Sequence, residues 1–211
     1  MPMPDDITPS AASRRTYQSP LRERQALQTR DEILDALTEL LAHQRADEVN
    51  TKDLARAAGV SERTVYRHFA DRLALVEGLT DRLAAFTGGS PSAQRLEDIK
   101  PIVIKLMQQL EAHYVEARAE ALLNADPRRY TETTRDHTRE FREAVAVTLP
   151  ELNDDQLQAV AALVRVLVSA QTWLRMREEF NIAGDTAGPI VAWAIDALMR
   201  EVQRGNPPPS R

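Results

Sequence analysis

The residues best suited to chemistry lie in the stretch TKDLARAAGVSERTVYRHF, at 51–69. Two short helices are predicted here, at 52–58 and 62–69. Gly59 falls between them and supplies the backbone freedom that a tight turn needs. The spacing therefore predicts a helix-turn-helix, two short helices that cross at a fixed angle.

Each helix of this pair has a predicted cap and a predicted buried side. Thr51 and Ser61 are expected to cap the two helices, because a hydroxyl can accept an orphaned backbone N–H. Ala55 must be small where the second helix crosses above it, and Val65 and Phe69 are expected to anchor that helix from beneath. The opposite side of the second helix is then left for solvent or a partner.

That outward side carries groups that recognise DNA. Arg can bond bidentately to guanine, Thr can offer its hydroxyl or methyl group to a base, and Tyr, His and Arg can reach phosphates. An ordinary helical hairpin with a solvated face is the alternative. The outward residues are Glu62, Arg63, Thr64, Tyr66, Arg67 and His68.

The block TKDLARAAGVSERTVYRHFADRLALVEGL resembles the DNA-binding signature of the TetR/AcrR regulators. In that family a Tyr-x-x-Phe-x-x-Lys-x-x-Leu element links the recognition helix to the fourth helix. Here the element is Tyr66, Phe69, Arg72 and Leu75, so Arg replaces the usual Lys and keeps the charge but not the geometry. The chain also departs before Thr51, where AHQRADEVN stands in place of the family's usual aromatic and glycine.

The resemblance implies a DNA-binding role for several motif residues. Phosphate contacts are implied for Thr51, Tyr66 and Arg72, and Ser61 belongs to the same surface. Base contacts are implied for a second group. These are Arg63, Thr64, Arg67 and His68. The implied partner is double-stranded DNA with a near-palindromic operator, because one short helix reads too few base pairs and regulators of this shape act as twofold pairs.

The rest of the chain predicts an all-α fold, because it is rich in Ala, Leu, Glu, Arg and Gln, and alternating β-type runs are rare. About nine helices are expected, the others at 21–43, 71–87, 93–112, 114–124, 128–148, 154–180 and 187–203. The predicted organisation has four parts. They are a disordered arm at 1–20, a DNA-binding domain at 21–87 with its motif at 51–70, a ligand-binding and dimerisation domain at 88–204, and a disordered tail at 205–211.

Composition narrows the function further. Cysteine is absent, which excludes disulfides, thiolate zinc sites and cysteine nucleophiles. No apolar run approaches the roughly 20 residues of a membrane span. The N-terminus is acidic and contains proline, whereas a secretory signal has a basic start and an apolar block. We therefore expect a cytoplasmic protein without a membrane partner.

Charge also limits how this chain can meet DNA. The net charge is −5 and the pI near 5.5, so any DNA contact must be local rather than spread over the whole surface. Basic side chains slightly outnumber acidic ones in residues 14–70, whereas acidic ones dominate in 71–211. Four arginines form an arm that either lies on the DNA backbone or is only a solvated leader. They are Arg14, Arg15, Arg22 and Arg24.

The last two predicted helices are expected to form a homodimer interface. Their apolar residues run nearly all round each helix, which suggests two partners, although burial within one subunit is the alternative. Trp173 and Trp193 are expected to anchor the contact, and three small residues would allow close approach. The small residues are Ala192, Ala194 and Ala197.

The resemblance also implies a pocket for an unknown small-molecule effector among the middle helices. His113 or Arg139 would supply a polar handle, and core packing is the alternative role for each lining residue. The candidate lining residues are Phe86, Met107, Tyr114, Phe141, Trp173 and Met176.

Signatures of catalysis and cofactors are lacking in the sequence. It has no nucleophile elbow, phosphate loop or dinucleotide fingerprint. His137 has Asp136 beside it and Glu140 one turn later, which is more typical of a solvated helix face than of a metal site. We expect no enzyme, metal or cofactor, but a ligand-controlled DNA-binding regulator, with repressor favoured over activator by the resemblance alone. An interaction protein and an all-α enzyme or carrier are the alternatives.

Overall fold

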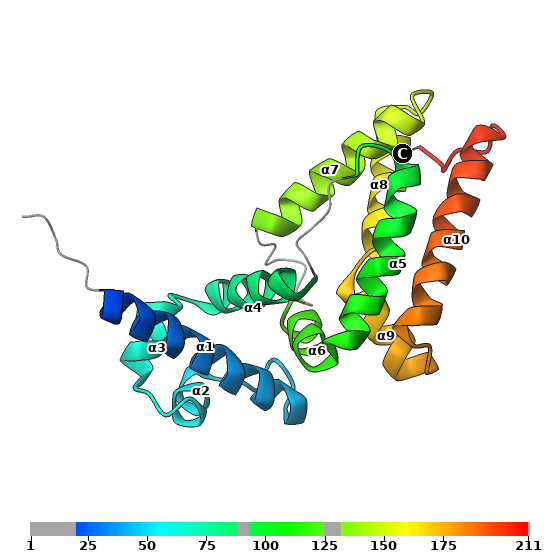
Figure 1. Ribbon diagram of the computed structural model, residues 1–211. Helices are drawn as coiled ribbons and strands as arrows, with labels where there is room; N and C mark the ends of the chain where they lie inside the picture. The colour runs from blue at the N-terminus through cyan, green and yellow to red at the C-terminus, as the bar shows by residue number, and fades with distance from the viewer. Residues whose placement is uncertain (1–19, 88–92, 125–131, 211) are drawn as a thin grey trace, which may run out of the picture.

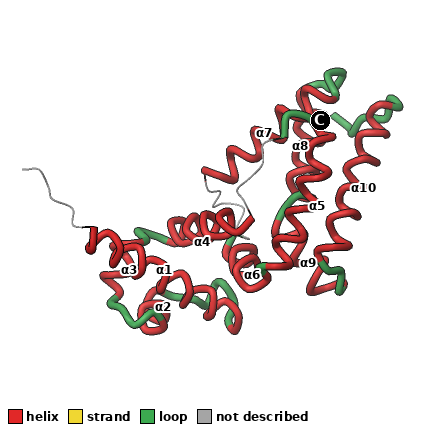
Figure 2. The backbone as a smooth tube through the Cα atoms, in the orientation of Figure 1, coloured by secondary structure: helices red, strands yellow, loops and turns green. Residues whose placement is uncertain are grey.

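The computed structural model describes residues 20–87, 93–124 and 132–210. Every regular element in these ranges is a helix, which confirms the predicted all-α class (Figure 2). Most of the predicted arm, including Arg14 and Arg15, lies outside the described residues, and so does the predicted boundary between residues 87 and 88. The helices are α1 (Pro20–His43), α2 (Thr51–Ala57), α3 (Glu62–His68), α4 (Arg72–Thr87), α5 (Leu96–Ala112), α6 (Tyr114–Leu123), α7 (Glu132–Thr148), α8 (Asp154–Leu167), α9 (Ala170–Phe180) and α10 (Gly184–Gln203).

The helices form two groups, each around its own apolar core (Figure 1). We call α1–α4 the head and α5–α10 the body. The head core contains Leu37 and Leu41 of α1 together with Leu54, Val65 and Phe69 of the helix-turn-helix. These positions follow the helical period, so each helix presents one apolar stripe to the same centre. Helix α4 runs from the head toward the body, and α6 lies beside its far end.

In the body, α10 packs along α5, and glycine makes the approach possible. A Cβ on Gly184 would collide with the carbonyl oxygen of Met107, and one on Gly188 would lie 2.8 Å from the Cα of Ile104. Any larger side chain would push the helices apart. The small-residue face of α10 is therefore used within the subunit, and Ala192 of the predicted dimer contact is buried there as well.

The prediction of one helix over 154–180 is wrong, because two helices occupy this range. Helix α8 ends at Leu167 and α9 begins at Ala170, with a bend of 53° between them. Ser169 adopts extended backbone angles, and its hydroxyl accepts the backbone N–H of Thr172 at 3.1 Å. This N-cap starts a new helix where apolar periodicity alone predicts continuation.

The final helix also begins earlier than predicted. It starts at Gly184 rather than at residue 187, and Pro189 lies inside its first turns instead of marking its start. In the described part of the chain no single helix is long and apolar enough to cross a membrane. Helices α8 and α9 reach that length and composition only as a bent pair.

Candidate nucleic-acid interface

The helix-turn-helix forms as its local sequence predicts, with one difference at its start. Asn50, not Thr51, is the N-cap of α2, and its side-chain oxygen accepts the backbone N–H of Asp53 at 2.9 Å. Gly59 adopts φ +66°, a left-handed conformation that favours glycine. Ser61 then caps α3 by accepting the backbone N–H of Thr64 at 3.1 Å. The two caps and the glycine together fix the crossing of α2 and α3.

Helix α3 is held from beneath by the head core. Val65 and Phe69 are each 1% exposed, and the small side chain of Ala55 is buried under the crossing. A Cβ on Gly78 of α4 would lie 2.8 Å from Cε1 of Phe69, so α4 can approach this ring only with glycine there. The inner side of α3 therefore has little freedom to rotate.

The predicted DNA-binding residues divide by exposure. Ser61, Arg63, Tyr66 and Arg67 are exposed, whereas the other four are half-buried at the margins of the same surface. The half-buried residues are Thr51, Thr64, His68 and Arg72. The structure thus places all eight on the helix-turn-helix and the start of α4.

Hydroxyl groups pair at two points on this surface. Thr51 Oγ1 and Tyr66 Oη lie 3.3 Å apart, although fifteen residues separate them in the chain. Ser61 Oγ and Thr64 Oγ1 lie 2.9 Å apart at the start of α3. The first pair joins the N-terminus of α2 to the outer side of α3. It offers two O–H groups that can donate to a bound acceptor.

Arg72 contacts the loop that precedes α2. Its Nη2 donates to the carbonyl oxygen of Ala46 at 2.6 Å. This loop is where the sequence departs from the usual aromatic and glycine, and a cleft of about 390 Å³ lies beside it. Leu54 and Phe69 are among the apolar residues of that cleft, and Thr51, Tyr66 and Arg72 are among its polar ones.

Arg30 of α1 is a positioning residue that the sequence prediction missed. Its guanidinium carbon lies 4.4 Å from the centroid of the Phe69 ring, and its Nη1 donates to the carbonyl oxygen of His68 at 3.4 Å. Burial lowers the pKa of His68, and the cations of Arg67 and Arg30 lower it further. One signal was available: Arg30 occupies the helical register of Ile33, Leu34 and Leu37, where an apolar residue is expected.

In the body, the structure brings five of the six predicted ligand residues to one apolar core. Met107 and Trp173 are buried there, and Tyr114 and Met176 pack against them. The Tyr114 and Trp173 rings meet edge to face, with centroids 5.7 Å apart. Phe141 packs half-buried against the same core from α7. Phe86 lies elsewhere, 42% exposed at the end of α4, where it stacks on the ring of His113 at 4.6 Å.

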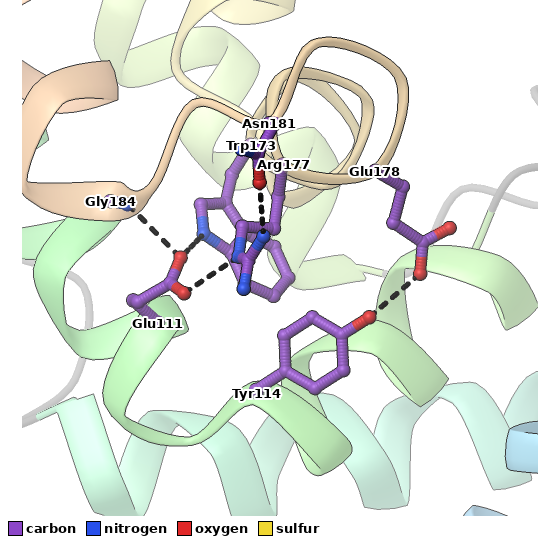
Figure 3. Close-up of polar contacts among 7 residues, drawn as sticks. All are labelled: Glu111, Tyr114, Trp173, Arg177, Glu178, Asn181 and Gly184. Atoms are coloured by element: carbon purple, nitrogen blue, oxygen red, sulfur yellow. Dashed lines mark hydrogen bonds and ion pairs between the residues drawn. The ribbon is translucent and has the colours of Figure 1, made fainter.

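Trp173 is consequently no anchor for a second subunit, because it is fully buried. Its Nε1 donates to Glu111 Oε2 at 3.1 Å (Figure 3). Arg177 Nε donates to the other carboxylate oxygen at 2.8 Å, and the backbone N–H of Gly184 donates to Oε2 at 3.0 Å. Burial raises the pKa of Glu111, but these three donors together lower it below its ordinary value. The carboxylate thus joins α5, α9 and the start of α10.

His137, predicted to lie on a solvated helix face, is half-buried on α7. Asp136 pairs with Arg139 at 2.7 Å. Burial lowers the pKa of His137, and the charge of Arg165 lowers it further. Among the described residues, no three His, Asp or Glu side chains are grouped so that they could hold a metal ion.

Comparison with known proteins identifies relatives of this chain. Residues 33–79 match the family model described as "Bacterial regulatory proteins, tetR family". The chain is 29% identical over 116 residues to the HTH-type transcriptional regulator AlkX of Mycobacterium tuberculosis, which is 55% of each protein. It is 45% identical over 53 residues to the nucleoid occlusion factor SlmA of Aliivibrio fischeri, covering 25% of this chain and 27% of SlmA. The chain thus matches about half the length of AlkX and about a quarter of SlmA.

Solved structures resemble the fold over most of its length. A TetR-family transcriptional regulator from Rhodococcus sp. superimposes with a TM-score of 0.60 at 24% identity, covering 82% of this chain and 99% of the other. NalD of Pseudomonas aeruginosa, a secondary repressor of the MexAB-OprM multidrug efflux pump, superimposes with a TM-score of 0.61 at 17% identity, covering 82% and 96%. At these identities the likeness concerns the fold of head and body together.

Proposed function

Because this chain belongs to the TetR family of bacterial regulatory proteins, we propose that it is a sequence-specific DNA-binding transcriptional regulator. The observation that carries the proposal is the outer side of α3. Arg63, Tyr66 and Arg67 are exposed there, while Val65 and Phe69 hold the inner side in the head core. A rigid helix with a polar, basic outer side suits the major groove of DNA.

Different residues serve different parts of the DNA. Arg63, Thr64 and Arg67 are the candidates for base edges, with His68 at the margin as a further one. The paired hydroxyls of Thr51 and Tyr66 are placed to donate to one phosphate. Ser61 lies at the start of the same helix. Arg72 at the start of α4, whose guanidinium donates to the carbonyl oxygen of Ala46, is the further candidate for a phosphate contact.

The proposed active form is a homodimer that reads a near-palindromic operator. Helices α8 and α10 support this, because they expose large apolar side chains that have no role in their own subunit's core. Leu163 and Val166 lie on α8, and Ile190 and Trp193 on α10; Trp193 is 66% exposed. Covering such residues against a second copy is favourable, and tryptophan is enriched at the centres of interfaces.

We further propose that a small-molecule effector binds the body and releases the protein from its operator, so that the protein acts as a repressor. The support is the group of Met107, Tyr114, Trp173 and Met176, which places aromatic and flexible side chains beside the polar Glu178. Phe141 packs against the same core, and Phe86 is the outlying candidate. The mechanism would be a population shift toward a spacing of the two recognition helices that no longer fits successive major grooves. A non-enzymatic, cytoplasmic protein is consistent with this role.

The experiment is a DNA-binding measurement on the DNA upstream of the protein's own gene. Fluorescence anisotropy over a salt series is expected to show affinity that falls linearly on logarithmic axes as counterions are released. Arg63→Ala should weaken binding to that DNA more than to an unrelated duplex. Arg175→Ala is the matched control, because Arg175 is exposed on α9 and pairs with Glu179 in its own helix. A salt-insensitive, sequence-blind signal that ignores Arg63→Ala would overturn the proposal.

A further inference from the structure

Helix α6 belongs to both apolar cores. Ala117 and Ala121 lie in the body core, whereas Ala119 and Leu123 lie in the head core. Each pair is four residues apart and so shares a face, and the two pairs are offset by two residues, which places them on opposite sides of the helix. Helix α6 is therefore packed between head and body, in contact with α1 and α4 on one side and with α5 and α9 on the other (Figure 1).

Arg118 lies between these two faces and contacts an element on either side. Its Nη1 donates to the carbonyl oxygen of Leu41 at 2.8 Å. Leu41 is in the last turn of α1, where carbonyl groups lack a partner in their own helix and attract positive charge. Its Nε donates to Glu178 Oε1 of α9 at 2.6 Å. One guanidinium thus joins the first helix of the head to the ninth helix of the chain.

The body holds the acidic partner in place. Tyr114 Oη donates to the same Glu178 oxygen at 2.8 Å (Figure 3). Partial burial raises the pKa of Glu178, but its bonds to Arg118 and Tyr114 outweigh this and lower it. The Arg118 and Glu178 side chains are 25% and 37% exposed, which is far less than the 73% and 51% of the Arg175–Glu179 pair on the outside of α9. Solvent therefore screens the first pair less than the second.

We propose that Arg118 is a positioning residue that couples the body to the DNA-binding head by tying α9 directly to the C-terminus of α1. The apolar faces of α6 hold head and body together, and Arg118 sets the orientation of α1 relative to α9. The effect of this coupling on DNA binding rests on the proposed function. A shift of α9 would be transmitted through Arg118 to α1, the helix that carries Arg30 and part of the head core. The coupling itself is a property of the chain and can be measured without DNA.

The test is equilibrium unfolding in urea followed by two signals. Both tryptophans, Trp173 and Trp193, lie in the body, so tryptophan fluorescence reports body unfolding, whereas far-UV circular dichroism reports all helices. In the native protein the two curves are expected to coincide, as in a single cooperative transition. In Arg118→Met the dichroism curve should develop an earlier phase, with its midpoint about 0.5–1 M urea below the fluorescence midpoint.

Two further variants make the result specific. Arg118→Lys keeps the charge, but one ammonium cannot reproduce the fork that reaches Leu41 and Glu178, so it should also separate the curves. Arg175→Met is the control for loss of an arginine pair on α9 and should leave the curves superimposed. Coincident curves in both Arg118 variants, or the same separation in Arg175→Met, would overturn the coupling role.

The DNA-binding experiment has a separate outcome. Arg118→Met is expected to change affinity for the operator while leaving the exposed residues of α3 intact. If the native protein does not bind DNA specifically, the proposed function fails, but the two unfolding curves still decide the role of Arg118.

Discussion

The hydroxyl groups of Thr51 and Tyr66 lie 3.3 Å apart across the helix-turn-helix. Thr51 is the first residue of α2, and Tyr66 is 54% exposed on the outer side of α3. Two hydroxyls at this separation can both donate to one phosphate oxygen, whereas without DNA they satisfy each other. In the proposed DNA contact, this pairing would hold both hydroxyls in position before DNA binds.

Tyr66→Phe removes one of these donors without changing the shape of α3. We expect operator affinity to fall about tenfold, because a hydrogen bond to a charged group is lost, and the salt dependence to stay nearly unchanged, because tyrosine carries no charge that releases a counterion. Anisotropy at several salt concentrations measures both. Thr51→Ala should act on the same contact, so the double variant should lose less affinity than the two single losses combined. Fully additive losses would argue against a shared phosphate.

Arg30→Met should weaken DNA binding by destabilising the head, although Arg30 is not itself a proposed DNA contact. It removes the cation over the Phe69 ring and the bond to the His68 carbonyl, while its unbranched side chain still fills space. We expect a loss of about 1–2 kcal/mol in the free energy of unfolding, with reduced preference for the operator over unrelated DNA. Arg45→Met is the control, because Arg45 pairs with Asp47 in full exposure. Equal effects of the two substitutions would remove the positioning role of Arg30.

Trp193→Ser should weaken the dimer. Trp193 and Phe180 are both 66% exposed, but only Trp193 lies on the proposed interface of α8 and α10. Loss of a buried tryptophan anchor should raise the dimer dissociation constant at least about 30-fold, as measured by analytical ultracentrifugation. Phe180→Ser should leave that constant unchanged. If Phe180→Ser dissociates the dimer and Trp193→Ser does not, the interface lies elsewhere.

Glu120→Gln should raise stability above neutral pH. Glu120 is 6% exposed on α6, and its Oε1 accepts hydrogen bonds from Thr80 at 3.2 Å and Asn124 at 3.1 Å. Burial raises the pKa of Glu120, and these bonds and the charge of Arg165 only partly oppose it. Glutamine keeps an oxygen acceptor and removes the buried charge.

The sign of this pH dependence follows from the raised pKa. The unfolded chain loses the Glu120 proton at lower pH than the folded one, so the native protein loses stability as pH rises between the two values. We expect Glu120→Gln to gain about 1 kcal/mol at pH 8 and nothing below about pH 4, where the carboxyl is protonated in both states. Urea unfolding at the two pH values measures this. A gain that is equal at both would refute the explanation.

Glu111 should show the opposite pH dependence. Its pKa is lowered in the folded state, so its stabilising effect is present above the unfolded pKa and lost as pH falls through the folded value. Glu111→Gln should cost about 1–3 kcal/mol at pH 7, because an amide N–H₂ would face donors from Trp173, Arg177 and Gly184. The difference from the native protein should shrink on acidification. Tryptophan fluorescence should report the change through Trp173.

Local sequence was sufficient to predict the helix-turn-helix and the all-α class. Gly59 and Ser61 specify the turn and the cap through their own backbone and hydroxyl chemistry, and apolar residues at helical spacing predict each helix without knowledge of its partner. The same reasoning failed at Ser169, because an N-cap inside an apolar run competes with helix continuation, and the surrounding packing selected the break.

Only the tertiary structure decided which side chains meet across the chain. Trp173 and Trp193 both lie among apolar residues in the sequence, yet Trp173 is fully buried and Trp193 is exposed. The packing places Trp173 of α9 against Glu111 of α5, whereas Trp193 lies on the exposed side of α10. Arg30 and Arg118 find their partners 38 and 77 residues away along the chain. Periodicity specifies which face of a helix is buried, but the choice of a distant partner depends on how whole helices pack. The sequence therefore determined the helix-turn-helix, and the packing determined which residues hold it in place.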